Sequence, residues 1–184
     1  MLQHPFTRLP PSEQKKVSLI LILCSIAVMA VLTVLGEPLH TQNAPLGIVS
    51  FELAKTPVKA RQMIAEWGAT GQIIAAFHLG LDYLFLLLYS SALALGCALI
   101  VDKTAQRRSL YDVAGIVLSW SQFGAAGLDS IENAALMNLL SGAQWSGWPG
   151  LAWCCACVKF LIVCAGLCYI VAGITFMLIK KAVQ

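Results

Sequence analysis

Charged residues are scarce in this 184-residue chain: Asp, Glu, Lys and Arg make up 11% of it, against about 25% in soluble globular proteins. Apolar residues reach 59%, and the mean hydropathy is +0.78. No polar stretch is long enough for a separate soluble domain, and the basic residues form no stripe that would bind nucleic acid. These deficits exclude a soluble or disordered protein and predict a single domain, residues 1–184, embedded in a lipid bilayer.

Four runs of mostly apolar residues are long enough to cross a bilayer, which takes about 20 residues of helix. They cover residues 17–35, 73–101, 110–140 and 151–179. Ser109 stands immediately before the third run, and Asp112 stands three residues after Ser109, which is the spacing of a capping box. The pattern predicts an all-α fold, an antiparallel four-helix transmembrane bundle.

The basic residues outside the four runs are unevenly distributed. One side of the predicted bundle holds Arg8, Lys15, Lys16, Lys103, Arg107, Arg108, Lys180 and Lys181. On the other side, three basic residues are balanced by three acidic ones. Because basic loops stay in the cytoplasm, both termini are expected to be cytoplasmic. A signal peptide is the alternative for residues 17–35, but this run exceeds the about 7 to 15 residues of a typical apolar signal core.

The outer segment between the first two runs, residues 36–72, is too long for a plain connection. Pro45 and Pro57 mark two helix starts, and Gly68 closes the second helix. We expect two short amphipathic helices that cap the bundle. An ordered loop without a function of its own is the alternative.

Ionisable residues inside the predicted spans are costly in a bilayer and are therefore candidates for a functional site. His78 and Asp82 stand four residues apart on the second span, on one helix face that continues to Tyr89. On the third span, Asp129, Glu132 and Asn133 share a face, and Lys159 lies in the fourth span among small residues.

These charged side chains are expected at one depth, because each lies roughly 12 to 16 Å from the outer end of its helix at about 1.5 Å per residue. One lysine cannot neutralise three carboxylates, so we expect at least one carboxyl to keep its proton. A buried ion pair that fixes helix register is one interpretation. A site for a small molecule or a proton, open to the outer face, is the other, with His78 as a proton carrier or as a neighbour of a carboxylate.

Five of the seven cysteines lie in the fourth span, and Cys154 and Cys157 form a C-x-x-C motif at its start. In this motif alone the chain resembles vitamin K epoxide reductases, which would imply thiol chemistry on a quinone. The outer segment lacks the second cysteine pair that relays electrons in those enzymes. No histidine is spaced to bind zinc with these thiols, and His4 and His40 lie outside the spans, so neither a metal nor a haem cofactor is expected.

Three stretches and a lysine together resemble a family of small bacterial four-span membrane proteins without an assigned function. They are residues 45–54 (PLGIVSFELA), 80–85 (GLDYLF, continuing to Tyr89) and 127–136 (GLDSIENAAL), with Lys159-Phe160 in the last span. The resemblance implies the inner membrane of a bacterium, and it adds Glu52 to the candidate residues.

The leading hypothesis is a protein that binds a small molecule or proton, or assists its transport, with Lys159 contacting an anionic or carbonyl group and the carboxylates passing protons. One alternative is an intramembrane enzyme acting on a lipid-soluble substrate such as a quinone, through the same cluster or through Cys154 and Cys157. The other is a structural subunit, as a homo-oligomer or in a larger membrane complex.

Overall fold

The computed structural model describes residues 3–104 and 110–182, and every secondary-structure element in these ranges is a helix. Arg107, Arg108 and Ser109 lie outside the described residues. The elements, in chain order, are α1 (Pro11–Gly36), the short 3-10 helix η1 (Glu37–Leu39), α2 (Ile48–Glu52), α3 (Pro57–Thr104), α4 (Leu110–Leu140) and α5 (Trp148–Ala182). The predicted all-α fold is confirmed.

Three of the described helices, α1, α3 and α5, are long and apolar enough to cross a membrane. The α4 helix is not among them, although it has 31 residues. Its sequence is interrupted by polar residues that lie buried against the other helices, including Gln122, Asp129 and Glu132. The polar side chains of α4 therefore face the other helices.

The α3 helix contains a break at Gly68, whose φ of 58° and ψ of −168° are not helical. Glycine reaches positive φ without the steric cost that a Cβ would impose. The break separates residues 57–67 from the long apolar part of α3. The cap segment, defined as residues 37–67, thus holds η1, α2 and this first part of α3, where the sequence predicted two short helices.

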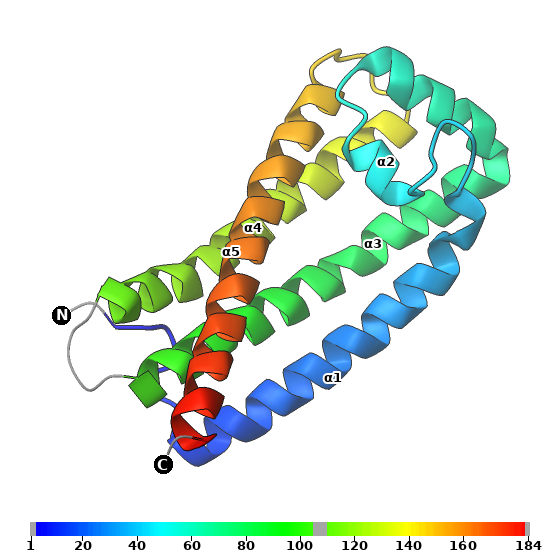
Figure 1. Cartoon of the computed structure of the whole chain (residues 1–184). Helices are drawn as coiled ribbons and strands as arrows, with labels where there is room; N and C mark the ends of the chain where they lie inside the picture. The colour runs from blue at the N-terminus through cyan, green and yellow to red at the C-terminus, as the bar shows by residue number, and fades with distance from the viewer. Residues whose placement is uncertain (1–2, 105–109, 183–184) are drawn as a thin grey trace.

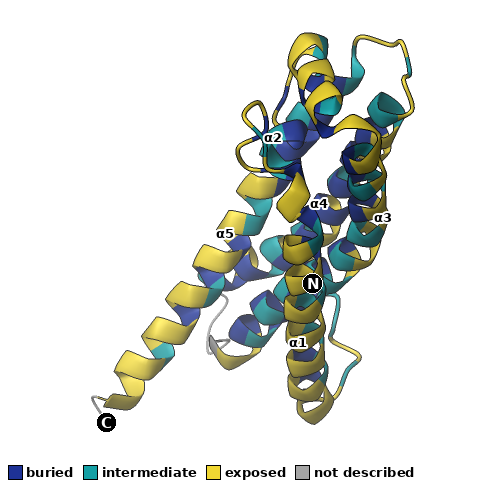
Figure 2. Cartoon of the chain, turned by 90° about the vertical axis from the view of Figure 1, so that its right-hand side faces the viewer, coloured by how far each residue is buried: buried dark blue, intermediate teal, exposed yellow. Residues whose placement is uncertain are grey.

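The α3 helix is the central one. It packs against α1, α4 and α5, and α4 also packs against α5 (Figure 1). Half of the most apolar stretch of α3 is buried, compared with 11% in α1 and 17% in α5. Figure 2 shows the outer faces of α1 and α5 as largely exposed. The start of α1 and the end of α5 lie at the end of the molecule away from α2 (Figure 1).

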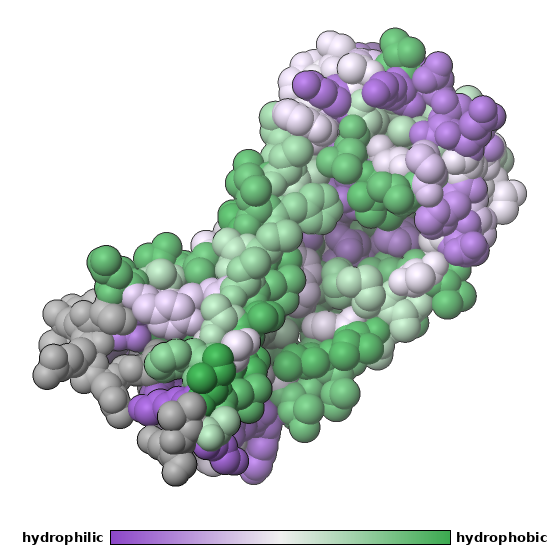
Figure 3. Space-filling model, in the orientation of Figure 1, coloured by the Kyte–Doolittle hydropathy of each residue, from purple (hydrophilic) through white to green (hydrophobic). Residues whose placement is uncertain are grey.

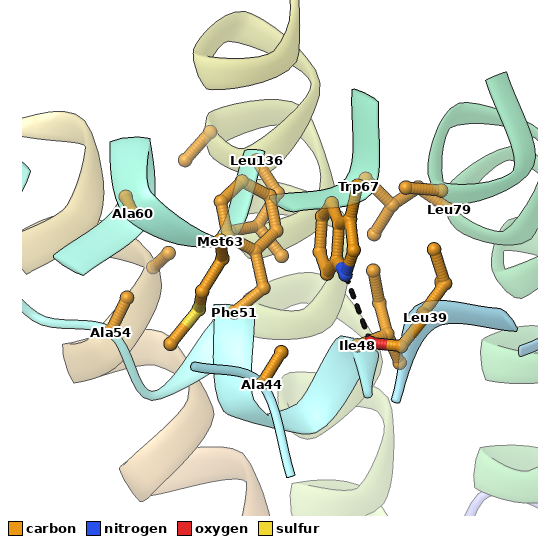
Figure 4. Packing of buried hydrophobic residues seen from close by; sticks show 13 residues of the cluster. Leu39, Ala44, Ile48, Phe51, Ala54, Ala60, Met63, Trp67, Leu79 and Leu136 are labelled. Atoms are coloured by element: carbon orange, nitrogen blue, oxygen red, sulfur yellow. Dashed lines mark hydrogen bonds between the residues drawn. The ribbon is translucent and has the colours of Figure 1, made fainter. Parts of the chain in front are cut away.

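The cap segment is fixed to the helices by its own apolar core (Figure 4). Phe51 of α2 packs edge-on against Trp67, with ring centroids 5.1 Å apart. The Trp67 indole N–H donates to the Leu39 carbonyl at 2.9 Å, which joins α3 to η1. Leu136 of α4 and Ala152 of α5 complete this core. The position of α2 over the helices is therefore set by packing.

Small residues allow α4 and α5 to approach closely. A Cβ at Gly166 would lie 2.5 Å from Nε2 of Gln122, the amide of which donates to the Ile162 carbonyl at 3.2 Å. The Ser119 hydroxyl donates to the Ala94 carbonyl of α3 at 2.7 Å. These contacts join the three inner helices about two to three turns further from the cap than the ionisable residues.

Hydropathy divides the surface into zones. Hydrophobic side chains cover α1 and α5, whereas hydrophilic ones gather at the cap and at the opposite end (Figure 3). The exposed side chains on α1 include Leu19, Ile20 and Leu23, and those on α5 include Leu161 and Val171. A continuous apolar surface of this kind is unusual in water and common in lipid.

Candidate functional site

Lys159 of α5 lies at the centre of a buried cluster of carboxyl groups. Its Nζ donates to Asp129 Oδ1 at 2.6 Å and to Glu132 Oε1 at 3.0 Å. Glu52 Oε2 lies 3.6 Å from the same nitrogen. The four side chains are between 0% and 11% exposed. The predicted buried cluster of Lys, Asp and Glu is confirmed, and we call Glu52, Asp129, Glu132 and Lys159 the carboxylate cluster.

Three elements supply the cluster. Asp129 and Glu132 stand three residues apart on the face of α4 that meets α5, and Lys159 faces them from among buried Ala152, Cys155 and Ala156. Glu52 comes from α2, where Phe51 next to it is fully buried in the cap core. The cluster therefore joins α4, α5 and the cap.

The charges in the cluster are unequal in number, because three carboxyl groups surround one ammonium group. Glu52 Oε2 is buried without a hydrogen-bond partner. Burial raises the pKa of Glu52 above its ordinary value, and the nearby Lys159 charge offsets only part of that shift. The Lys159 ammonium donates hydrogen bonds to Asp129 and Glu132, whereas Glu52 Oε2, at 3.6 Å, forms an ion pair with it without a hydrogen bond. The predicted role of Lys159 as the contact for an anionic or carbonyl group of a ligand stays a prediction.

Asp82 forms a second polar group beside the cluster, on α3. Its Oδ2 accepts a hydrogen bond from Asn133 Nδ2 at 2.7 Å. Within residues 3–104 and 110–182, no Lys, Arg or His nitrogen lies within 4.0 Å of the Asp82 carboxyl group. Tyr89, two turns further along α3, donates to Asp129 Oδ2 at 2.8 Å. Asp129 therefore bridges Tyr89 and Lys159, whereas Asp82 carries no ion pair.

His78 lies buried on the same face of α3, but it interacts with the backbone of Leu32 in α1. In the described part of the chain, no hydrogen bond joins it to Asp82. Its ring also lies 3.4 Å from where a Cβ on Gly36 would be. The predicted face of His78, Asp82 and Tyr89 is present, and His78 serves there as a contact between α3 and α1.

A cleft of about 580 Å³ opens between α1 and α5, with α3 as its floor and the cap at one end; we call it the lateral cleft. Figure 3 shows a hollow below the cap in which hydrophilic atoms are visible. Its ionisable lining residues gather near the cap and comprise His40, Glu52, His78, Asp82, Tyr89, Asp129 and Lys159. Glu132 and Asn133 do not line it, so they lie behind this polar end.

The rest of the lateral cleft has apolar walls. Ile22 and Ile26 of α1, Leu93 of α3, and Val163 and Leu167 of α5 line it away from the cap. Asp82 and Leu93 are separated by about 16 Å along α3, at about 1.5 Å per residue. The cleft thus has one polar end and a long apolar end, and this distribution of polarity matches that of an amphiphilic molecule.

The cysteine pair lies elsewhere. Cys154 is exposed and Cys157 is half-buried, and neither lines the lateral cleft. All seven cysteines are free. In the described ranges, no three His, Cys, Asp or Glu side chains are arranged to hold a metal ion. The cleft and the C-x-x-C motif are therefore separate features.

Sequence reasoning missed the contribution of α1, which supplies one wall of the cleft without an ionisable residue. Ser25 and Thr33 are polar lining positions on that helix, but each hydroxyl donates to a carbonyl one turn earlier in α1. In the sequence, these two hydroxyl residues could not be distinguished from ordinary polar residues of a helix. Phe85 and Phe160, which line the polar end, could not be separated from lipid-facing aromatic residues.

Comparisons with known proteins return no relative: no family model, no curated protein and no solved structure matches the chain.

Proposed function

We propose that this is an integral membrane protein in which α1, α3, α4 and α5 form four antiparallel spans in the inner membrane of a bacterium, with both termini cytoplasmic. The apolar surfaces of α1 and α5 support this arrangement, as does the inward polarity of α4. Lys15 and Lys16 lie near the start of α1, and Lys180 and Lys181 lie in the last turn of α5. Both helix ends are at the end of the molecule away from the cap (Figure 1), as expected for cytoplasmic basic residues.

We further propose that the protein binds a small lipid-soluble molecule, and a proton with it, in the lateral cleft. The carrying observation is that the cleft joins an apolar wall reachable from lipid to a set of buried carboxyl groups. A molecule dissolved in the bilayer would enter between α1 and α5 and bring its polar group to Asp82 and Tyr89. The hydrogen bonds from Tyr89 to Asp129 and from Lys159 to Asp129 offer a route for a proton into the cluster.

The other two hypotheses have less support. A thiol redox enzyme would require a substrate at Cys154 and Cys157, and the lateral cleft reaches neither residue. A purely structural role for the cluster remains testable, because Lys159 joins α5 to α4 and to the cap. Neither hypothesis accounts for a cleft that ends at carboxyl groups.

The test uses two tryptophan substitutions on α5. Val163→Trp would fill the cleft, whereas Val158→Trp places the same side chain at an exposed position outside it. Native mass spectrometry of protein extracted from its own membranes would detect bound small molecules. We expect an adduct on the parent that Val163→Trp loses and Val158→Trp keeps. If the parent carries no adduct that depends on Val163, the proposal is wrong.

A further inference from the structure

The polar end of the lateral cleft carries more acid than base. Three carboxyl groups, those of Glu52, Asp129 and Glu132, lie within 4.0 Å of the Lys159 ammonium, and the Asp82 carboxyl group lies beside this cluster, bonded to Asn133. That ammonium is enclosed by these three groups, so its charge is offset before it can act on a ligand. A cation beside Asp82, which has no ion pair in the described part of the chain, would gain a favourable charge interaction, and an anion there would be repelled.

Asp82 is the carboxyl group available for such a cation. It lines the cleft, is half-buried and has no ion pair in the described part of the chain. Its bond from Asn133 fixes one oxygen and orients the group. Glu52 lines the same cleft, and its Oε2 lies 3.6 Å from the Lys159 ammonium but accepts no hydrogen bond. A buried acceptor without a donor is costly, and a ligand that donates a hydrogen bond would satisfy it.

Aromatic rings surround the same place. Phe85 and Tyr89 are 5.2 Å apart between ring centroids, tilted by 50°, and both line the cleft beside Asp82. Phe160 lines it from α5, but its ring already has the Lys159 ammonium 5.1 Å from its centroid. The faces of aromatic rings attract organic cations, and a carboxylate beside such rings is a common way to bind an alkylammonium group. A neutral polar molecule would gain little from this combination.

From these observations we propose that the ligand of the lateral cleft is a lipid-soluble organic cation of the alkylammonium type, whose charged group binds Asp82 beside Phe85 and Tyr89. This proposal rests on the proposed function, because it specifies the ligand of the same cleft. The apolar part of the ligand lies along α1, α3 and α5, away from the cap. Lys159 acts by holding Asp129 and Glu132 in place rather than by contacting the ligand.

The first test compares two probes that have nearly the same shape and opposite charge, tetraphenylphosphonium and tetraphenylborate. Equilibrium binding of each is measured on the purified full chain. We expect tetraphenylphosphonium to bind saturably and at least about tenfold more tightly than tetraphenylborate. This comparison needs no substitution, so it does not depend on the folding of a variant.

The second test removes the proposed contact. Asp82→Asn keeps an oxygen to accept the Asn133 hydrogen bond and removes the charge, and we expect it to weaken tetraphenylphosphonium binding at least about tenfold. The control is Glu13→Gln, which removes one exposed negative charge on α1 outside the cleft and should leave binding unchanged.

Two outcomes would separate failure of this inference from failure of the proposed function. If both probes bind equally, Val163→Trp abolishes both and Asp82→Asn changes neither, the cleft binds lipid-soluble molecules and the preference for a cation is wrong. If neither probe binds, or if binding does not depend on Val163, both the inference and the proposed function are wrong.

Discussion

Neutralising the carboxylate cluster one group at a time and all together should have opposite effects on stability. Lys159→Met leaves Asp129, Glu132 and Glu52 without their cation at sites that are at most 11% exposed. Breaking a buried ion pair in this way typically costs about 3 to 5 kcal/mol. For a protein of this size we expect the melting temperature to fall by about 6 to 20 °C.

Replacing the whole cluster should cost much less. The fourfold variant Lys159→Met, Glu52→Gln, Asp129→Asn and Glu132→Gln removes every charge of the carboxylate cluster together. Exchanging a complete buried ionic set for neutral groups of similar volume is often neutral or stabilising by about 1 to 4 kcal/mol. We therefore expect the fourfold variant to melt close to the parent or above it.

The assay is thermal unfolding of each purified variant in one detergent, followed by circular dichroism. The control is Lys16→Met, which breaks the exposed pair of Lys16 and Glu13 at 3.1 Å and should change stability by less than about 1 kcal/mol. If the fourfold variant melts as far below the parent as Lys159→Met does, the cluster makes a net stabilising contribution to the packing of the helices. That result would refute the view that these charges serve a ligand.

Three further predictions concern the cap and the helix contacts. Because burial raises the pKa of Glu52, its contribution to stability is present at low pH and is lost as pH rises through that pKa. As pH rises above the ordinary pKa of a glutamate, the parent should therefore lose more stability than Glu52→Gln, measured as the difference of their melting temperatures, and equal losses would contradict this. Gly166→Ala places a Cβ 2.5 Å from Gln122 Nε2 and should destabilise by about 1 to 3 kcal/mol. By contrast, Gly124→Ala, with open space at its Cβ, should be neutral or stabilising in the same thermal assay. Trp67→Phe removes a 2.9 Å hydrogen bond to a buried backbone carbonyl of the cap and should lower the free energy of unfolding, measured by chemical unfolding, by about 1 to 3 kcal/mol. A midpoint equal to that of the parent would show that the cap is fixed by packing alone.

The helical fold and the cluster were largely predictable because both follow from short-range periodicity. Asp129 and Glu132 had to share a face of one helix, and equal depth in the bilayer brought Lys159 to the same level. Glu52 could not be placed this way, because α2 is a single short helix positioned by the tertiary packing of Phe51 and Trp67. Only a resemblance pointed to it.

The lateral cleft could not be predicted, since its walls depend on how helices far apart in sequence diverge. The α1 helix packs along α3 and leaves space towards α5. No sequence pattern in α1 indicates this space. For the same reason, the predicted contact between Lys159 and a ligand could not be judged from sequence. Three carboxyl groups lie within 4.0 Å of the ammonium, and one of them comes from the cap.

The most direct measurement of the central claim is photolabelling in lipid vesicles with an aliphatic amine that carries a diazirine, followed by peptide mapping. We expect labelling of Leu93, on the floor of the lateral cleft, and its suppression by an excess of unlabelled amine. Leu161, which is 72% exposed and outside the cleft, should be labelled from the lipid and should not respond to the competitor. If Leu93 is not labelled, or if its labelling persists with the competitor just as that of Leu161 does, the cleft is not a binding site for a lipid-soluble molecule.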